Sequence, residues 1–195
     1  MSRAREIARL KITLEYFAPP VTRTIEVPFD LKLDRLHRVI QAAMGWTDSH
    51  LYEFTAGAAG WGIPDADFGD GPLPASKTSL REVIEDTGQR QIDYIYDFGD
   101  GWEHKIKIED ISLADPAQVY PRLVSASGRC PPEDVGGVPG YQEMLEAIAD
   151  PKHEDHDWMV ECHGASFDAE DPETENLAQA VARLAIKWTP KRKIN

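Results

Sequence analysis

The strongest constraint on the fold is a pair of alternating segments that flank a Gly-Asp-Gly turn at residues 99–101. Apolar or aromatic side chains occupy every second position from Ile92 to Phe98 and from Trp102 to Ile108 within residues 91–98 and 102–111. Such alternation is typical of β-strands that bury one face. A three-residue loop with Gly101 in the left-handed conformation keeps the apolar set on one side. The sequence therefore predicts an antiparallel hairpin, with the pairs Phe98/Trp102, Tyr96/His104, Tyr94/Ile106 and Ile92/Ile108.

Two further segments predict a second hairpin near the start of the chain. Residues 7–17 and 21–29 alternate in the same way, and Pro19-Pro20 stands between them as a stiff turn. Residues 50–54 predict another strand.

Helical spacing of apolar residues predicts helices at 34–44, 80–86, 141–149 and 172–188. Asp30 or Asp34 is expected to cap the first helix, and Gly45 to end it. Ser79 and Glu82 form a capping-box pattern before the second helix.

Residues 56–76 and 112–140 are rich in glycine and proline and predict long irregular segments. No repeat or linker divides the 195 residues, so we predict one domain over residues 1–195. The expected class is α+β: an antiparallel or mixed sheet built from hairpins, with helices packed on it.

The negative charge of the protein is concentrated in one segment. The formal net charge is −13, and residues 130–175 contain 14 acidic side chains but only one basic one, Lys152. Residues 176–195 contain five basic side chains and no acidic one. An acidic surface repels phosphates, which disfavours nucleic acid as a partner over that face. A solvated surface that keeps the protein soluble is the simpler interpretation.

The sequence also predicts a cytoplasmic location. The first residues are not followed by the apolar stretch of a signal peptide, and no uncharged run is long enough to span a bilayer. Cys130 and Cys162 do not form the pattern of a secreted disulfide framework. No membrane association and no cofactor are indicated.

Several motifs together resemble the plasmid pRi ORF-three-like family. They are LKITL at residues 10–14, PPV at 19–21, LHRVIQAAMGW at 36–46, SHLYEF at 49–54, YIYDFGDGWEH at 94–104, CPPEDVGG at 130–137 and GY at 140–141. The resemblance spans about residues 10–168 and is specific because the motifs share their order and spacing with the family.

The resemblance implies a compact α+β domain without an established activity, from a family found on plasmids, insertion elements and chromosomes. Some members carry a transposon-resolvase label. We do not transfer that function, because neither Ser49 nor Ser79 lies in the Arg-rich sequence that a serine resolvase needs. The chain also has Thr22-Arg23-Thr24 where a Trp-Arg-Arg-like stretch is usual, and Val135 where a second cysteine is frequent.

The densest chemistry lies in the YDFGDGW and CPPED motifs. We expect a ligand site where the 46–50 connector, the 99–104 hairpin end and the 130–137 loop meet. The candidate ligand-binding residues are Trp46, His50, Asp97, Asp100, Trp102, Glu103, His104, Cys130, Glu133 and Asp134. Facing carboxylates suit a hard cation or a basic ligand. In the alternative interpretation, Asp97 and Asp100 serve the turn, His104 is a core residue and the CPPED motif is a structural loop.

A second group of metal-ligand types occurs further along the chain. His153, His156, Cys162 and His163 follow helical spacing, but they do not form a recognised zinc pattern. A solvated polar helix is the simpler interpretation, so we predict no metal there.

Three functional hypotheses follow. The first is a cytosolic, non-catalytic binding or accessory module of a mobile-element-associated family, with a basic or amide-bearing ligand such as a peptide. The second is a metal-assisted hydrolase that uses His50, Asp97, His104, Glu133 or Asp134. The third is a protein-interaction partner in a transposon or plasmid system, which binds a basic protein through its acidic segment.

Overall fold

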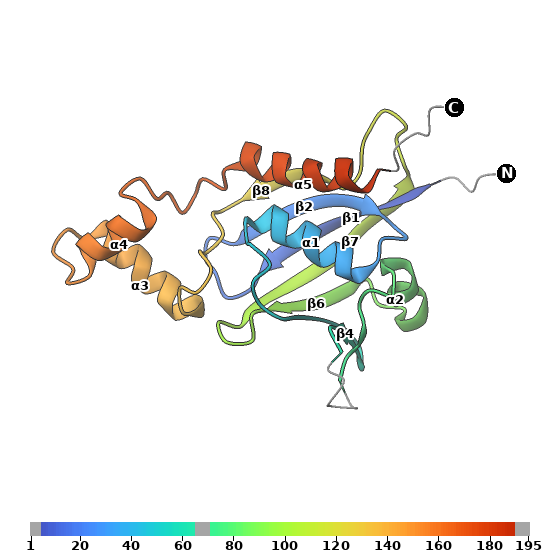
Figure 1. The fold of residues 1–195 in the computed structure, drawn as a ribbon, viewed down its shortest axis with the longest axis horizontal. Coiled ribbons are helices and arrows are strands. Elements are labelled where there is room, and N and C mark those ends of the chain that lie inside the picture. Colours follow the sequence, from blue (N-terminus) through green and yellow to red (C-terminus); the bar gives the residue numbers. More distant parts are fainter. Residues whose placement is uncertain (1–4, 65–70, 190–195) are drawn as a thin grey trace.

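An eight-stranded mixed sheet forms the centre of the protein, as the computed structural model of residues 5–64 and 71–189 shows (Figure 1). Its strands are β1 (Glu6–Leu14), β2 (Val21–Pro28), β3 (Tyr52–Ala56), β4 (Ala59–Gly62), β5 (Leu73–Pro74), β6 (Gln91–Tyr96), β7 (Trp102–Leu113) and β8 (Arg122–Ser127). They lie in the order β5-β4-β3-β6-β7-β1-β2-β8. The β4–β5 pair is parallel and the other pairs are antiparallel, which confirms the predicted α+β class.

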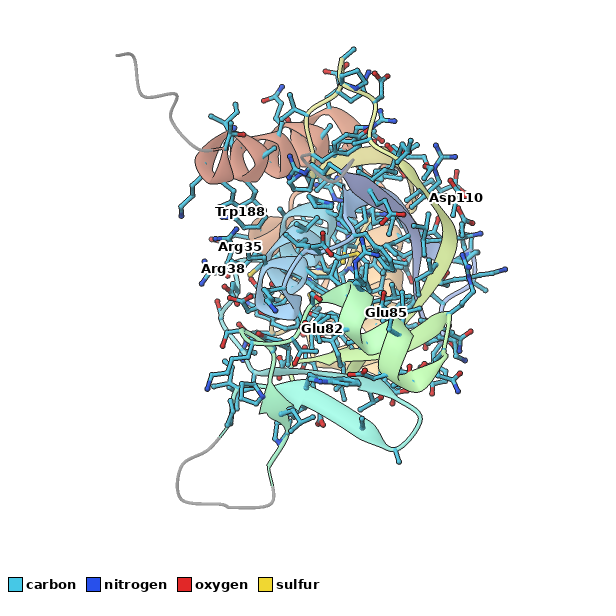
Figure 2. All side chains as sticks on the ribbon, turned by 90° about the vertical axis from the view of Figure 1, so that its right-hand side faces the viewer. Arg35, Arg38, Glu82, Glu85, Asp110 and Trp188 are labelled. Atoms are coloured by element: carbon cyan, nitrogen blue, oxygen red, sulfur yellow. The ribbon has the colours of Figure 1, made fainter. Side chains whose placement is uncertain are left out.

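Helices pack on this sheet or extend away from it. They are α1 (Leu33–Met44), α2 (Leu80–Thr87), α3 (Gly137–Ala149), α4 (His156–His163) and α5 (Thr174–Trp188). Figure 2 shows Arg35 of α1 and Trp188 of α5 on one side of the molecule and Asp110 of β7 on the other. The Arg35 guanidinium lies 5.2 Å from the centre of the Trp188 ring. Within residues 5–64 and 71–189, none of the helices has the length and apolarity that a membrane crossing requires.

Helices α3 and α4 form an arm that extends away from the sheet (Figure 1). We call residues 137–163 the acidic arm. The first turns of α3 attach it to the core, where Tyr141 packs edge-on against Phe17 at 5.5 Å between ring centres. No residue of α4 is buried.

The structure confirms some of the predicted helix caps. Ser79 and Glu82 form the reciprocal capping box at the start of α2, and Gly45 ends α1 with a φ of 91°. The predicted cap of α1 is wrong: residue 32 occupies that position without a side-chain hydrogen bond. Asp30 is instead paired with Arg81 at 2.5 Å.

The hairpin forms, but its predicted register is wrong by two residues. Tyr96 pairs with Trp102 and Tyr94 with His104, so the loop contains five residues, 97–101. The side-chain oxygen Oδ1 of Asp97 accepts the backbone N–H of Gly99 at 2.9 Å, which ends the strand at Tyr96. Phe98 is consequently 54% exposed rather than part of the apolar face. A shift of two residues preserves the buried face, because side chains alternate with a period of two.

Three strands were missed by the sequence patterns. Strands β4 and β5 lie within the segment predicted as a loop at 56–76, of which residues 65–70 lie outside the described residues. Strand β8 lies within the segment predicted to be irregular at 112–140. All three are short or lie near a sheet edge, where apolar alternation is weak because little of the strand is buried.

Arg23 of β2 occupies an unusual place for a charged residue, since it is buried in the core. Its guanidinium donates to four backbone carbonyl oxygens, which are those of Thr22, Ala43, Ser127 and Gly128. Arg23 therefore joins β2 to the last turn of α1 and to the end of β8.

Candidate functional site

Three loop segments interlock at one end of the sheet. We call them the connector (residues 46–50), the hairpin end (97–101) and the CPPED loop (130–137). The indole N–H of Trp46 donates to the carbonyl oxygen of Pro131 at 2.9 Å. The backbone N–H of Gly136 donates to Oδ2 of Asp100 at 3.2 Å. The CPPED loop is thus bound to both other segments.

Glu133 and Tyr96 are the centre of this interlock. The backbone N–H of Thr47 donates to Glu133 at 2.9 Å, and the Thr47 hydroxyl donates to the same carboxylate oxygen. The Tyr96 hydroxyl donates to the other oxygen and accepts the backbone N–H groups of Ser49 at 3.0 Å and His50 at 3.3 Å. Burial, followed by the bond to Glu133, raises the pKa of Tyr96 above its usual range. Both carboxylate oxygens of Glu133 are therefore engaged in positioning the connector.

The glycines of the CPPED loop permit a close approach to the hairpin end. Gly137 has a φ of 68°, and a Cβ atom there would lie 2.5 Å from the carbonyl oxygen of Asp100. No side chain fits at this distance, so glycine is needed at residue 137, where the backbone of the loop touches the hairpin.

His50, Asp97 and Asp134 come together beside this interlock. The Nε2 atom of His50 lies 3.0 Å from Oδ1 of Asp134 and 3.6 Å from Oδ2 of Asp97. Each residue comes from a different one of the three segments. The His50 side chain is 30% exposed and that of Asp134 is 74% exposed, whereas that of Asp97 is 11% exposed. The cluster is therefore open to solvent on the Asp134 side.

The local backbone holds both carboxylates in place. Asp97 and Asp134 have φ values of 56° and 60°, in the left-handed region that aspartate tolerates better than most residues. Oδ1 of Asp97 accepts the N–H of Gly99, so the turn role proposed from the sequence is confirmed. Its Oδ2 atom remains directed toward His50.

The aromatic and thiol candidates do not reach solvent at this site. Trp46, Trp102 and Cys130 are buried, with exposed fractions of at most 9%. The Trp46 ring stacks on Tyr96 with 5.0 Å between ring centres. Burial raises the pKa of the Cys130 thiol above its usual range, which disfavours a thiolate nucleophile.

His104 is a core residue rather than a member of the cluster. It is 2% exposed, its Nδ1 atom lies 3.3 Å from the carbonyl oxygen of Tyr94, and the Trp46 ring packs on it edge-on. Burial lowers the pKa of His104 to about 4, so the imidazole is neutral at pH 7.

The two other candidate carboxylates of this hairpin, Asp100 and Glu103, make contacts outside the cluster. Asp100 binds the backbone of Gly136 and so belongs to the interlock. Glu103 is exposed on β7 next to the buried Trp102, and it accepts the Tyr16 hydroxyl at 3.0 Å. Successive side chains of a strand point to opposite faces, so Glu103 is separated from the other candidates.

The potential ligands at residues 153–163 do not converge on one point within the described residues. In the part of the chain that the structure describes, His50, Asp97 and Asp134 form the one set of three or more potential ligands that converge. The Nδ1 atom of His153 accepts the N–H of Asp155, and that of His156 lies 2.8 Å from the carbonyl oxygen of Ala147. These two histidines stabilise the fold of the acidic arm.

Sequence reasoning missed the residues that support the connector. Tyr96 and Thr47 were not among the candidates, and neither was the pair of His37 and Asp48. His37 Nε2 lies 2.5 Å from Asp48, and its Nδ1 atom lies 2.8 Å from the Tyr94 hydroxyl. His37 lies eleven residues before Asp48 and 57 before Tyr94, so the sequence gives no local signal for these contacts. They depend on the packing of α1 against β6.

A hollow of about 310 Å³ borders the CPPED loop, and none of the three cluster residues lines it. Trp46, Cys130 and Glu133 contribute to its wall together with residues from α4 and the start of α5. The guanidinium of Arg129 also lines it and pairs with Glu173 at 3.1 Å.

The mixed sheet and its helices make this chain a small α+β protein. The chain belongs to the plasmid pRiA4b ORF-3-like protein family, whose sequence profile matches residues 6–176. This confirms the resemblance drawn from the motifs.

Two relatives support the assignment. The uncharacterized protein y4hQ of Sinorhizobium fredii (strain NBRC 101917 / NGR234) is 50% identical over 186 residues, which is 95% of each chain. The crystal structure of the protein of unknown function MM3350 from Methanosarcina mazei Go1 has a TM-score of 0.76 and 33% identity, and the match covers 88% of this chain and 98% of that one.

Proposed function

We propose that the protein is a binding module whose site is the cluster of His50, Asp97 and Asp134, and that the ligand presents a cationic group. The observation that carries this proposal is the convergence of one imidazole and two carboxylates from three interlocked segments. A site on well-supported loops loses little entropy when it binds, because its geometry is already established.

The structure supports a smaller range of ligand types than the sequence alone suggested. Asp97 and Asp134 supply carboxylate acceptors for a guanidinium, an ammonium or a metal ion. The aromatic surface expected from Trp46 and Trp102 is not available, because both rings are buried. Recognition therefore rests on charge and hydrogen bonds rather than on stacking.

Calorimetric titration of the full chain tests this proposal. The probes are arginine amide, spermidine and ZnCl₂, and the test variant is Asp97→Asn/Asp134→Asn. Asparagine keeps the Oδ1 acceptor and tolerates a positive φ, so the turn is preserved while both negative charges are lost. The matched control, Asp155→Asn/Asp157→Asn, removes two charges from the acidic arm.

At least one probe is expected to bind the wild-type protein and the control, and to bind the test variant at least about tenfold more weakly. Equal affinity for the test variant and the wild type, or no binding of any probe, would overturn the proposal.

A metal-assisted hydrolase is a second candidate. Three of the five residues considered for it, His50, Asp97 and Asp134, come together, whereas His104 is buried and Glu133 is fully engaged. Catalytic zinc sites commonly use three protein ligands and leave a position for water. Hydrolysis of p-nitrophenyl acetate and bis(p-nitrophenyl) phosphate, with added Zn²⁺ or Mn²⁺, tests this candidate. Equal rates for wild type and Asp134→Asn would count against it.

A third candidate is a protein-interaction partner that uses the acidic arm. What favours it is Trp158 of α4, which is 58% exposed on an arm dense in carboxylates. Salt-sensitive binding of a basic peptide that is lost in Trp158→Ala would support it. A cytosolic location and an association with mobile elements are further proposals, which rest on the sequence and the family.

A further inference from the structure

We infer that the cationic ligand is a single divalent metal ion, coordinated by Nε2 of His50, Oδ2 of Asp97 and Oδ1 of Asp134. This inference rests on the proposed binding function and names its ligand. It assigns a transition-metal site to residues that are 37 or more positions apart in the chain.

The distances within the cluster fit ligands of one ion. Ligand bonds of about 2.0–2.2 Å place neighbouring ligand atoms about 3.4 Å apart around a tetrahedral ion, and about 3.0 Å apart around an octahedral one. The two measured separations from His50 Nε2, 3.0 Å and 3.6 Å, bracket this range. The three ligand atoms all lie within 4.8 Å of one another.

The same contacts are poor as hydrogen bonds. The Nε2 atom of His50 is buried and makes no hydrogen bond, although a carboxylate oxygen lies 3.0 Å away. At that distance, the oxygen of Asp134 must lie well off the direction of a ring N–H. A lone pair on Nε2 that points to an ion between the three side chains explains the arrangement better.

The ligand types indicate which metal would bind. Ca²⁺ and Mg²⁺ prefer sites made only of oxygen atoms, whereas an imidazole with carboxylates suits Zn²⁺, Mn²⁺ and similar ions. Two carboxylates and a neutral imidazole balance the charge of a divalent ion. The exposed Asp134 side leaves room for water or for a donor atom of a further ligand.

The surrounding contacts position the three ligands in advance. Oδ1 of Asp97 is held by the N–H of Gly99, which leaves Oδ2 free to bind. Glu133 fixes the loop one residue before Asp134, and Tyr96 binds the backbone N–H of His50. Ligands that are oriented in this way by second contacts bind metals more tightly.

Titration of the chelator-treated full chain with Zn²⁺ and Mn²⁺ tests the inference, with calorimetry for stoichiometry and electron paramagnetic resonance of bound Mn²⁺ as a direct readout. One ion per chain is expected. His50→Gln and Asp134→Asn should each weaken binding at least about tenfold. The matched controls His153→Gln and Asp155→Asn, on the acidic arm, should bind as the wild type does. Unchanged thermal unfolding of the metal-free variants verifies that they fold.

The outcomes separate this inference from the proposed function. Binding of arginine amide or spermidine without stoichiometric metal would overturn the inference and leave the proposed function standing. Metal binding that persists in His50→Gln and Asp134→Asn would also overturn it, because the ion would then lie elsewhere. If no cationic probe binds, both fail.

Discussion

Tyr96→Phe is expected to destabilise the protein and to weaken its ligand site, although it removes only one oxygen atom. The Tyr96 hydroxyl accepts the N–H groups of Ser49 and His50 and donates to Glu133. Neutral hydrogen bonds contribute about 1 kcal/mol each and those to charged groups about 1.5–3 kcal/mol. Water can replace some of these hydrogen bonds at the exposed connector, so we expect the free energy of unfolding to fall by about 2 kcal/mol.

For a chain of about 200 residues, this loss corresponds to a decrease of about 4–8 °C in Tm. Urea unfolding followed by tryptophan fluorescence is a suitable assay, because the Trp46 ring stacks on Tyr96. Tyr16→Phe is the matched control: its hydroxyl also donates to a glutamate, Glu103, but at the exposed surface. An exposed bond of this kind contributes little to stability, so the control should change the unfolding free energy by less than about 0.5 kcal/mol.

Tyr96→Phe should also reduce the affinity for Zn²⁺ about tenfold. The backbone N–H of His50 loses its hydrogen-bond acceptor in this variant, although the side chains of the three proposed metal ligands are unchanged. If the unfolding free energies of Tyr96→Phe and Tyr16→Phe agree within about 0.5 kcal/mol, the Tyr96 hydroxyl does not hold the connector. The interlock would then have to depend on Trp46 and the glycines of the CPPED loop.

Three further predictions concern the interlock and the core. Gly137→Ala should lower the free energy of unfolding by more than Gly88→Ala does. Both glycines have a φ of 68°, but only a Cβ at residue 137 would meet backbone atoms, those of Asp100. Equal losses in urea unfolding would show that the CPPED loop can move away from the hairpin at little cost. Burial lowers the pKa of His104 to about 4, so this histidine binds a proton in the unfolded chain before it does so in the folded one as the pH falls below about 6.5. The free energy of unfolding should therefore decrease by about 2 kcal/mol between pH 7 and pH 5. His104→Gln should remove this decrease, and an unchanged pH dependence of the free energy of unfolding would show that His104 does not cause it. Arg23→Met should cost about 3 kcal/mol or more in urea unfolding, because four backbone carbonyl oxygens lose their donor; a loss below about 1 kcal/mol would mean that water replaces the guanidinium.

The family motifs have a structural reason that their sequences alone do not reveal. Gly137 of CPPEDVGG allows the loop to touch the hairpin of YDFGDGW, and Glu133 binds the connector that follows α1. Three motifs far apart in the chain thus form one interlock. The acidic residues next to these structural positions, Asp97 and Asp134, are the ones that remain available for a ligand.

Much of the secondary structure followed from the sequence because it depends on local periodicity. Alternation at 7–17, 21–29 and 91–111 was enough to predict strands and their buried faces. The capping box at Ser79 and the left-handed Gly45 were predictable because caps depend on a few neighbouring atoms. The hairpin register was not, because alternation is unchanged by a shift of two residues and only the Asp97 turn decided it.

The sequence by itself determined the α+β class, the family and the region in which a site was to be sought. The tertiary structure decided which candidates belong together. His104 and Cys130 have suitable chemistry but lie in the core, whereas His50, Asp97 and Asp134 face one another. The physical reason is that strand parity and local turns set the direction of each side chain, while the meeting of distant loops depends on long-range contacts such as those of Glu133 and Gly137.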